Sequence, residues 1–210
     1  MSSARFPGKM LAPFRGRPLI ARVLERFREH DLHARVVVLT SLDPTDDPLA
    51  DFVSVRCGTA VFRGDLDNVV ARFQAALGEY PCDWFVRISG DSPLIDVSLV
   101  QAMIKFSDSG YDVVSNVVRR TFPPGQSVEC VRSDVLRALN ANELTPDQRE
   151  HVTKVFYDRP QDWRLRSVIC EEPGWSDTRM VVDRLEDLYA LEAGVTQPKS
   201  FGDLARLEST

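Results

Sequence analysis

Hydrophobic residues follow two spacings along the chain, one typical of helices and one typical of strands. Between residues 18 and 29 they recur every three or four positions behind Pro18, which predicts an amphipathic helix with proline in its first turn. Residues 34–40 form a short, continuous β-branched run, as in a central parallel strand covered on both faces. The same spacings predict further helices at 65–77, 97–106, 134–140, 146–156, 186–193 and 204–207, and further strands at 53–56, 84–88, 112–117, 128–131, 164–169 and 180–182.

Strands that alternate with helices indicate the α/β class, with an open, mostly parallel sheet and helices on both of its faces. No repeat, low-complexity tract or long linker interrupts the pattern, so we expect one domain over residues 1–210. Ligands of such sheets bind beyond the carboxyl ends of the strands. Asp91 and Asp183 each follow a predicted strand at this position.

Composition and charge narrow the class of protein. With 43% hydrophobic and 27% charged residues, the 210-residue chain resembles an ordinary globular protein, which excludes wholesale disorder. A net charge of −5 argues against nucleic acid or a membrane surface as a partner. We find no membrane-length apolar run and no secretory leader, and therefore expect a cytoplasmic protein. The four cysteines are far apart in sequence, which predicts reduced, buried thiols.

The N-terminal residues 2–9, SSARFPGK, combine the features of an anion-binding loop. Small residues allow close approach of the backbone to a phosphate, Arg5 supplies a planar fork of donors, and Lys9 supplies a mobile positive charge. The spacing is not that of a Walker A loop. The alternative is a plain, exposed N-terminal loop.

Asp91 and Asp183 are the second candidate feature. A carboxylate above the end of a buried strand is costly unless a cation shares the position, and Mg²⁺ is held by one or two carboxylates together with substrate phosphates. The two aspartates would share such an ion if their strands are neighbours. The alternative is that both are helix caps, Asp91 at the turn that follows it and Asp183 at the helix predicted for 186–193.

Other polar groups point to chemistry less directly. Arg149 and His151 lie on a predicted helix, where a single histidine is more often structural than catalytic. Arg119 and Arg120 stand in a loop that either binds an acidic substrate or is simply solvated. No HExxH or GxSxG spacing is present, which gives little support to metalloprotease or serine-hydrolase function.

A series of segments in chain order carries a family resemblance over nearly the whole chain. They are SSARFPGKML with RPLIARVLER, VVVLTS, VFRGDLDNVVARF, FVRISGDSPLID, DVVSN, RTFPPG with VE, REHVT and RMVVDRLEDL. Together they resemble the cytidylyltransferase family of the spore-coat polysaccharide biosynthesis type and, more distantly, the acylneuraminate and 3-deoxy-manno-octulosonate cytidylyltransferases. The resemblance implies a Rossmann-like fold of the nucleotide-diphospho-sugar transferase type, and an enzyme that joins CMP to a sugar.

The resemblance also implies roles for individual residues. Residues 119–170 would form an excursion for acceptor binding and dimerisation. Arg5 and Lys9 would bind the triphosphate and would be catalytic together with Asp91, and Asp91 and Asp183 would be the Mg²⁺ ligands. The implied nucleotide-binding residues are Ser3, Arg5, Lys9, Arg63, Ser89 and Gly90, and the implied acceptor-binding residues are Glu129, Arg149 and His151.

Three departures from the family pattern modify this expectation. Family members carry an apolar strand and Gln-Ala-Arg-Met-Gly before the N-terminal loop, so we expect the first central strand to be missing. Either the true start site lies upstream of Met1, or the chain is an inactive fragment. Residues 124–129 read PGQSVE where the family has two more carboxylates, which predicts a different acceptor sugar. Arg184 and Leu185 replace Thr-Pro and place a cation beside the proposed ion, which weighs against a second metal ion at Asp183.

We therefore expect a Mg²⁺-dependent nucleotidyltransferase that joins CMP from CTP to a sugar or sugar acid, for polysaccharide or glycan biosynthesis. Its partners would be CTP, the acceptor and a second copy in a homodimer, with no nucleic acid or membrane. One alternative is a glycosyltransferase, or a sugar nucleotidyltransferase of the same fold that uses another nucleotide. A non-catalytic nucleotide-binding module is the other.

Overall fold

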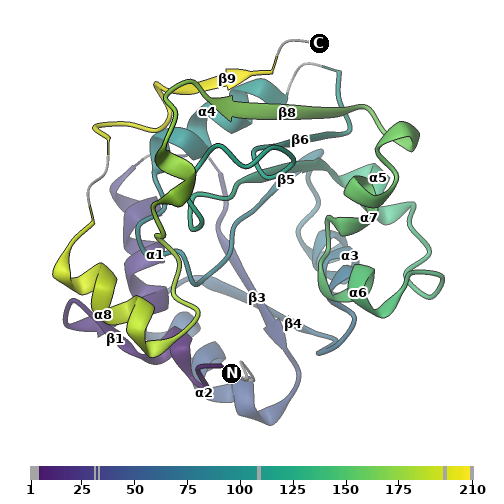
Figure 1. The fold of residues 1–210 in the computed structure, drawn as a ribbon. Helices are drawn as coiled ribbons and strands as arrows, with labels where there is room; N and C mark the ends of the chain where they lie inside the picture. Colours follow the sequence, from purple (N-terminus) through teal and green to yellow (C-terminus); the bar gives the residue numbers. More distant parts are fainter. Residues whose placement is uncertain (1–4, 31, 33, 108–109, 196–197, 209–210) are drawn as a thin grey trace.

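The computed structural model describes residues 5–30, 32, 34–107, 110–195 and 198–208, with strands in the middle and helices on both sides (Figure 1). The strands are β1 (Pro13–Phe14), β2 (Arg17–Pro18), β3 (Val37–Ser41), β4 (Ala60–Gly64), β5 (Trp84–Arg87), β6 (Val113–Ser115), β7 (Glu129–Arg132), β8 (Leu165–Cys170) and β9 (Ala205–Leu207). The helices are α1 (Leu19–Glu29), α2 (Asp47–Asp51), α3 (Val69–Glu79), α4 (Val97–Ser107), α5 (Ser133–Arg137), α6 (Pro146–Glu150), α7 (Lys154–Asp158) and α8 (Leu185–Ala193).

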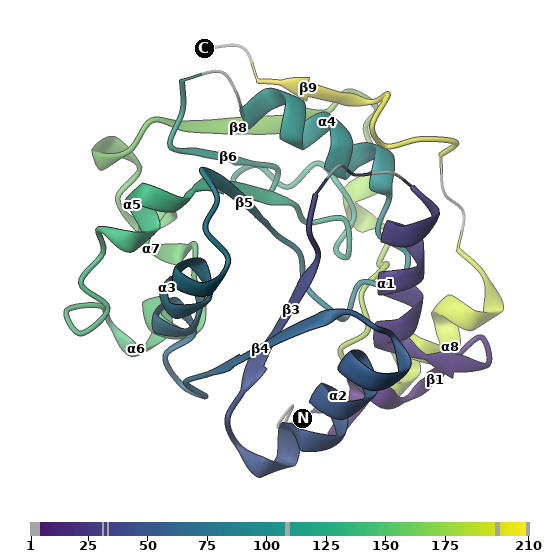
Figure 2. The same cartoon turned by 180° about the vertical axis from the view of Figure 1, so that it is seen from behind.

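Alternating residues of the central strands point into two hydrophobic cores. Val114 and Cys130 belong to the core that includes Val23 of α1 and residues of α4. Their chain neighbours Val113 and Val131 belong to the opposite core, with residues of α3, α5 and α7. The period of two that strand geometry imposes thus produces a three-layer arrangement, and the two views of the fold show helices on both sides of the strands (Figure 2). The predicted α/β class with helices on both faces is confirmed.

The strands form separate hydrogen-bonded sheets. Five strands pair in the order β5-β7-β6-β8-β9, in which β6 and β8 are parallel, while β3 and β4 form a parallel pair of their own. In the described residues, no strand pair joins β3 to β5. Val37, Val38 and Leu39 are only half-buried, so this strand is less covered than its sequence predicts.

Three local predictions are wrong, and one strand was not predicted. Residues 53–56 are helical, because they extend α2 into a wider π-helical turn and Val53 packs beside Ile20 and Leu24 of α1. β4 was not predicted at all. Residues 204–207 contain β9, which pairs antiparallel with β8, instead of a helix. Residues 180–182 form no ladder and make single backbone hydrogen bonds to the 119–125 loop and to Asp91.

The predicted helix over residues 146–156 is divided into α6 and α7. Thr145 and Gln148 form a capping box that begins α6, and the chain leaves helical geometry at His151.

The prediction of buried thiols holds for Cys130 and Cys170 but is wrong for Cys82, which is exposed in the loop before β5, and Cys57 is only half-buried. Of the helices described, none combines the length and the apolar character needed to span a membrane.

Candidate active site

Four charged side chains from three parts of the sequence meet at one point. Lys9 Nζ lies 2.7 Å from Asp91 Oδ2 and 3.6 Å from Asp183 Oδ1, and donates to the Val182 carbonyl at 2.9 Å. Arg5 Nη2 lies 3.0 Å from Asp183 Oδ1. The structure therefore brings the N-terminal cations and both aspartates together, although Asp91 and Asp183 are 92 positions apart in the chain.

Backbone hydrogen bonds hold the two aspartate segments together. The Val182 N–H donates to the Asp91 carbonyl at 2.9 Å, and the Met180 N–H donates to the Pro124 carbonyl at 2.7 Å. Gly125 allows this second contact: its φ is +100°, and a Cβ there would lie 2.3 Å from the Met180 carbonyl oxygen. Only glycine fits such a left-handed position at this closeness.

The N-terminal segment reaches the aspartates because Gly90 has no side chain. A Cβ on Gly90 would lie 3.3 Å from both the Met10 sulfur and the Ile20 side chain. Lys9 begins a 3₁₀ turn, Lys9–Leu11, behind Gly8, whose φ is 73°. Met10 is thereby packed against the loop after β5, and the neighbouring Lys9 points toward Asp91.

The structure decides against the helix-cap alternative for both aspartates. The backbone N–H groups of Asp183 and Arg184 donate to Asp187 Oδ2, so Asp187 caps the start of α8. The Asp183 carboxylate contacts Arg5, Lys9 and Arg179 instead. Asp91 Oδ1 is buried and has no hydrogen-bond partner among the described residues.

This arrangement fits a magnesium ion. Asp91 offers a buried oxygen without a partner, and both carboxylates approach the same ammonium nitrogen, so that one cation can be near both. The described residues contain no group of three or more His, Cys, Asp and Glu side chains placed for a metal. An ion held here would therefore take its remaining oxygen ligands from phosphates and water, as Mg²⁺ commonly does.

Arg179 belongs to the site although the sequence analysis missed it. Its guanidinium lies 2.6 Å from Asp183 and 2.9 Å from Asp187. The hydrogen bond to Asp187 raises the pKa of Arg179. Burial would raise the pKa of Asp187, but the hydrogen bonds from Arg179 and from two backbone N–H groups lower it overall. The spacing of four residues between Arg179 and Asp183 was the available signal.

The remaining residues expected to bind nucleotide are placed differently. Arg63 donates to the Ser41 and Asp43 carbonyls at 2.8 and 3.1 Å and pairs with Asp47 at 2.6 Å, so it organises the loop after β3. Ser89 lies in the same loop as Asp91, directly after β5. Ser3 lies outside the described residues. The nucleotide contacts expected of these residues stay predictions.

Glu129 is the centre of a second polar group. Its side chain is 3% exposed and pairs with Arg87, while the Thr153 hydroxyl donates to it at 2.6 Å and the Tyr157 hydroxyl donates to it as well. The Tyr157 hydroxyl also lies 2.8 Å from Ser115 Oγ. Burial, and then the charge of Glu129, raise the pKa of Tyr157. Thr153 and Tyr157 were missed because a hydroxyl four residues from another has no distinctive pattern.

The other two expected acceptor residues are not part of this group. Arg149 donates to the Asn142 carbonyl at 2.7 Å, and His151 is exposed with Nε2 3.5 Å from Asp147. Gln126 lies between the two positions where the family has carboxylates, and it is fully buried. Its side chain accepts a hydrogen bond from the Asp96 N–H and donates one to the Leu94 carbonyl. It therefore shapes the loop after Asp91 instead of facing solvent.

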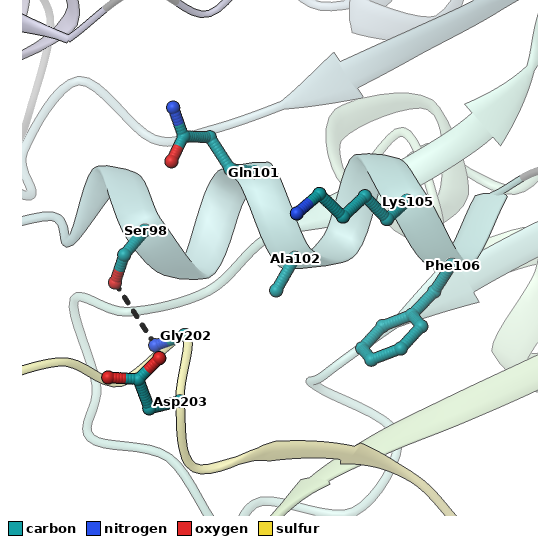
Figure 3. Close-up of a pocket in the computed structure, with 7 residues that line it drawn as sticks. All are labelled: Ser98, Gln101, Ala102, Lys105, Phe106, Gly202 and Asp203. Carbon is teal, nitrogen blue, oxygen red and sulfur yellow. Dashed lines mark hydrogen bonds between the residues drawn. The ribbon is translucent and has the colours of Figure 1, made fainter.

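A shallow hollow elsewhere on the surface contains none of the candidate residues. It lies between α4 and the chain at 202–203, where Lys105 extends along the helix and the Gly202 N–H donates to Ser98 Oγ at 3.1 Å (Figure 3). Its lining residues are Ser98, Gln101, Ala102, Lys105, Phe106, Gly202 and Asp203.

Comparison with known families identifies the chain. A sequence model described as cytidylyltransferase matches residues 1–204. The chain belongs to this cytidylyltransferase family. Among its relatives, the spore coat polysaccharide biosynthesis protein SpsF of Bacillus subtilis is 28% identical over 92% of this chain and 82% of its own length. A 3-deoxy-manno-octulosonate cytidylyltransferase of Mesorhizobium japonicum is 31% identical over 93% of this chain and 84% of its own.

Solved cytidylyltransferase structures share the architecture. A cytidylyltransferase from Leptospira borgpetersenii superposes with a TM-score of 0.86 at 28% identity, over 97% of this chain and 88% of that one. A CMP:2-keto-3-deoxy-manno-octonic acid synthetase, solved with CTP, superposes with a TM-score of 0.64 at 20% identity, over 91% and 93%. The fold predicted from the family resemblance, the nucleotide-diphospho-sugar transferase type, is thereby confirmed.

Proposed function

We propose that this cytidylyltransferase transfers CMP from CTP to a hydroxyl of a sugar or sugar acid and releases pyrophosphate. The observation that carries the proposal is the meeting of Arg5, Lys9, Asp91 and Asp183 beyond the end of β5. Relatives named for polysaccharide biosynthesis and for 3-deoxy-manno-octulosonate support the sugar or sugar-acid class of acceptor.

The chemistry requires positive charge at this point. The acceptor oxygen forms a bond to the α-phosphorus as the bond to the pyrophosphate oxygen breaks, and the acceptor hydroxyl loses its proton. Negative charge then grows on the leaving oxygens, where fixed cations are most effective. Arg5 and Lys9 supply these cations from the N-terminal segment, and no covalent bond to the protein is needed.

Asp91 and Asp183 would hold a magnesium ion. When bound, the ion would polarise the α-phosphate and make the acceptor hydroxyl more acidic. Both carboxylates are held in position. The backbone hydrogen bond from Val182 to Asp91 fixes the segment that carries Asp91, and Arg5 and Arg179 pair with Asp183. Asp187 keeps Arg179 in place beside Asp183.

The proposed acceptor end is the group around Glu129. Its carboxylate is held by Arg87, Thr153 and Tyr157, and it therefore keeps one orientation. Such a fixed acceptor of hydrogen bonds suits the hydroxyls of a sugar. Arg149 of α6 and His151, the residue that follows this helix, are the other residues proposed to face the acceptor.

Pyrophosphate release tests the proposal. The protein is incubated with Mg²⁺, one of CTP, UTP, ATP or GTP, and a panel of sugars and sugar acids that includes 3-deoxy-manno-octulosonate. Release with CTP alone, together with a CMP-sugar product found by mass spectrometry, is the expected result. Release with a different nucleotide would replace CTP in the proposal.

A second candidate function is a non-catalytic nucleotide-binding module, which is favoured because no ladder pairs β3 with β5 in the part of the chain that the structure describes. Such a module would bind CTP in calorimetry and release no pyrophosphate with any acceptor.

The homodimer and the cytoplasmic location also stay proposals. Light scattering in solution decides the first of them, and cell fractionation decides the second.

A further inference from the structure

Lys9 is held by two hydrogen bonds and a longer ion pair. Its ammonium group has three protons, and three oxygens surround it: Asp91 Oδ2 at 2.7 Å, the Val182 carbonyl at 2.9 Å and Asp183 Oδ1 at 3.6 Å. The side chain is only 11% exposed. In this position, two of the three protons are hydrogen-bonded and the ammonium also forms an ion pair with Asp183, so its charge is directed at the carboxylates.

The same two carboxylates are the proposed ligands of a divalent cation. An ammonium between them balances one of their two negative charges, and a second cation in the same space would be repelled by it. Lys9 and the ion therefore exclude each other from this position. The residue that binds phosphate must first leave the residues that bind the metal.

We propose that Lys9 acts as an exchangeable counter-ion, which holds Asp91 and Asp183 in the empty protein and moves from them to the triphosphate when a divalent cation binds with CTP. This inference rests on the proposed function, since it assumes that the two aspartates receive the ion. It adds that Lys9 makes binding of the ion and of the nucleotide depend on each other.

The surroundings of Lys9 allow this movement. Met10 is held against Gly90 and Ile20, which anchors the backbone, whereas the lysine side chain has four rotatable bonds. Asp183 keeps two other cations, Arg5 and Arg179, when Lys9 leaves. Asp91 pairs with Lys9 alone among the ion pairs of the described residues, and its buried Oδ1 is free of protein partners. Asp91 is thus the group whose charge the incoming ion must balance.

Cooperative binding follows from the exchange. A divalent ion that arrives alone must displace Lys9 into a position where no anion receives the ammonium. With CTP present, the phosphates receive it. The ion and the nucleotide each raise the affinity for the other by the same factor, which for such couplings is typically about 5-fold to 150-fold.

The first test measures Mn²⁺ binding to the nucleotide-free protein by electron paramagnetic resonance. Lys9→Met removes the competing ammonium, so we expect Mn²⁺ affinity to rise by about fivefold or more. Lys105→Met, a matched change of an exposed lysine on α4, is expected to leave the affinity unchanged. Equal affinity in the wild type and Lys9→Met overturns the exchange while leaving the metal site intact. No Mn²⁺ binding to any of the three proteins, with or without CTP, overturns the metal site as well.

The second test follows the lysine ammonium groups of the wild type by ¹⁵N NMR, so it does not depend on the folding of Lys9→Met. The chain has four lysines, and Lys9 is the most buried of those with a described side chain, so its signal is expected to exchange slowly with water. Lys9→Arg assigns the signal. We expect it to shift or disappear when Mg²⁺ and a non-hydrolysable α,β-methylene CTP are added. A signal unchanged in position and exchange rate at saturation would show that Lys9 stays between the carboxylates, and the exchange would be wrong.

Discussion

The backbone N–H of Val182 donates to the Asp91 carbonyl at 2.9 Å, and this one bond joins the two segments that carry the acidic residues of the site. It places Asp183, the next residue, within reach of the same lysine that pairs with Asp91. The site therefore depends on how the loop after β5 lies against residues 180–182. Substitutions at positions that contact these segments, away from the aspartates themselves, can therefore test how the site is held together.

Gly125→Ala is expected to disturb the site through the backbone. The alanine Cβ would overlap the Met180 carbonyl, and the alanine backbone would have to keep a left-handed φ. Together, these two effects should lower the free energy of unfolding, measured by urea titration, by about 3–5 kcal/mol. Gly174→Ala is the matched control, because its φ of +93° is similar but no atom lies within 4 Å. The control should lose only about 1–2 kcal/mol. Equal losses in both variants would mean that the contact with Met180 is unimportant.

Asp91→Asn is expected to abolish turnover and spare the fold. The asparagine keeps the size of the side chain but loses the charge that balances Lys9 and the proposed ion. Pyrophosphate release should fall by about 10²-fold or more, by analogy with the loss of one transition-state donor. Asp203→Asn, an exposed aspartate distant from the site, serves as control. Full activity of Asp91→Asn would remove this residue from the mechanism.

Glu129→Gln is expected to lower the pKa of Tyr157. Burial and then the charge of Glu129 raise the pKa of this phenol, so loss of the charge removes one of the causes that raise it. A raised pKa means that the fold favours the neutral phenol. Its stabilising contribution is therefore complete below pH 10, the ordinary value, and is lost as the pH rises further. Absorbance titration against Tyr157→Phe isolates the signal, and an unchanged Tyr157 titration in the variant would contradict the assignment.

Asp112→Asn is expected to make stability less dependent on acid. Asp112 accepts hydrogen bonds from the Arg164 N–H and guanidinium and from Arg132, and the Arg164 hydrogen bond holds its pKa below 3.8. Its stabilisation is therefore present above pH 3.8 and is lost as the pH falls toward the lowered value. The variant should be about 2 kcal/mol less stable at pH 7, with the difference closing in acid. Urea unfolding at several pH values measures this, and a constant difference would refute it.

The sequence predicted the long elements and the charged residues of the site best. α1 and α4 have enough helical periods for a clear pattern, and Asp91 and Asp183 each follow an apolar segment at a position where sheets bind ligands. The strand predicted for residues 53–56 was wrong because Val-Ser-Val-Arg is too short a pattern to distinguish a strand from a helical turn. β9 was not predicted because it pairs with β8, in which Ala205 lies opposite Cys170, 35 positions earlier, and local spacing does not encode such a contact.

Which side chains contact one another was the least predictable part of the site. That Asp187 and not Asp183 caps α8 depends on which carboxylate Arg5, Lys9 and Arg179 attract. That Glu129 meets Tyr157 depends on the break between α6 and α7. Both outcomes are set by tertiary packing, which a single sequence does not reveal.

The division between β3 and β5 gives the molecule two levels of local stability. Val38 and Val61 of the small sheet pack against Ile20 and Leu24 of α1. Among the residues that the structure describes, no strand ladder joins this sheet to the five-stranded one. We expect the amide protons of β3 and β4 to exchange with water sooner than those of β6 and β7, because the pair opens without the rest of the core. Arg63 lies in β4, in the pair expected to open first, whereas Asp91 and Asp183 lie outside this pair. The protection from exchange that a bound molecule gives to β3 and β4 would therefore show how far that molecule extends toward Arg63.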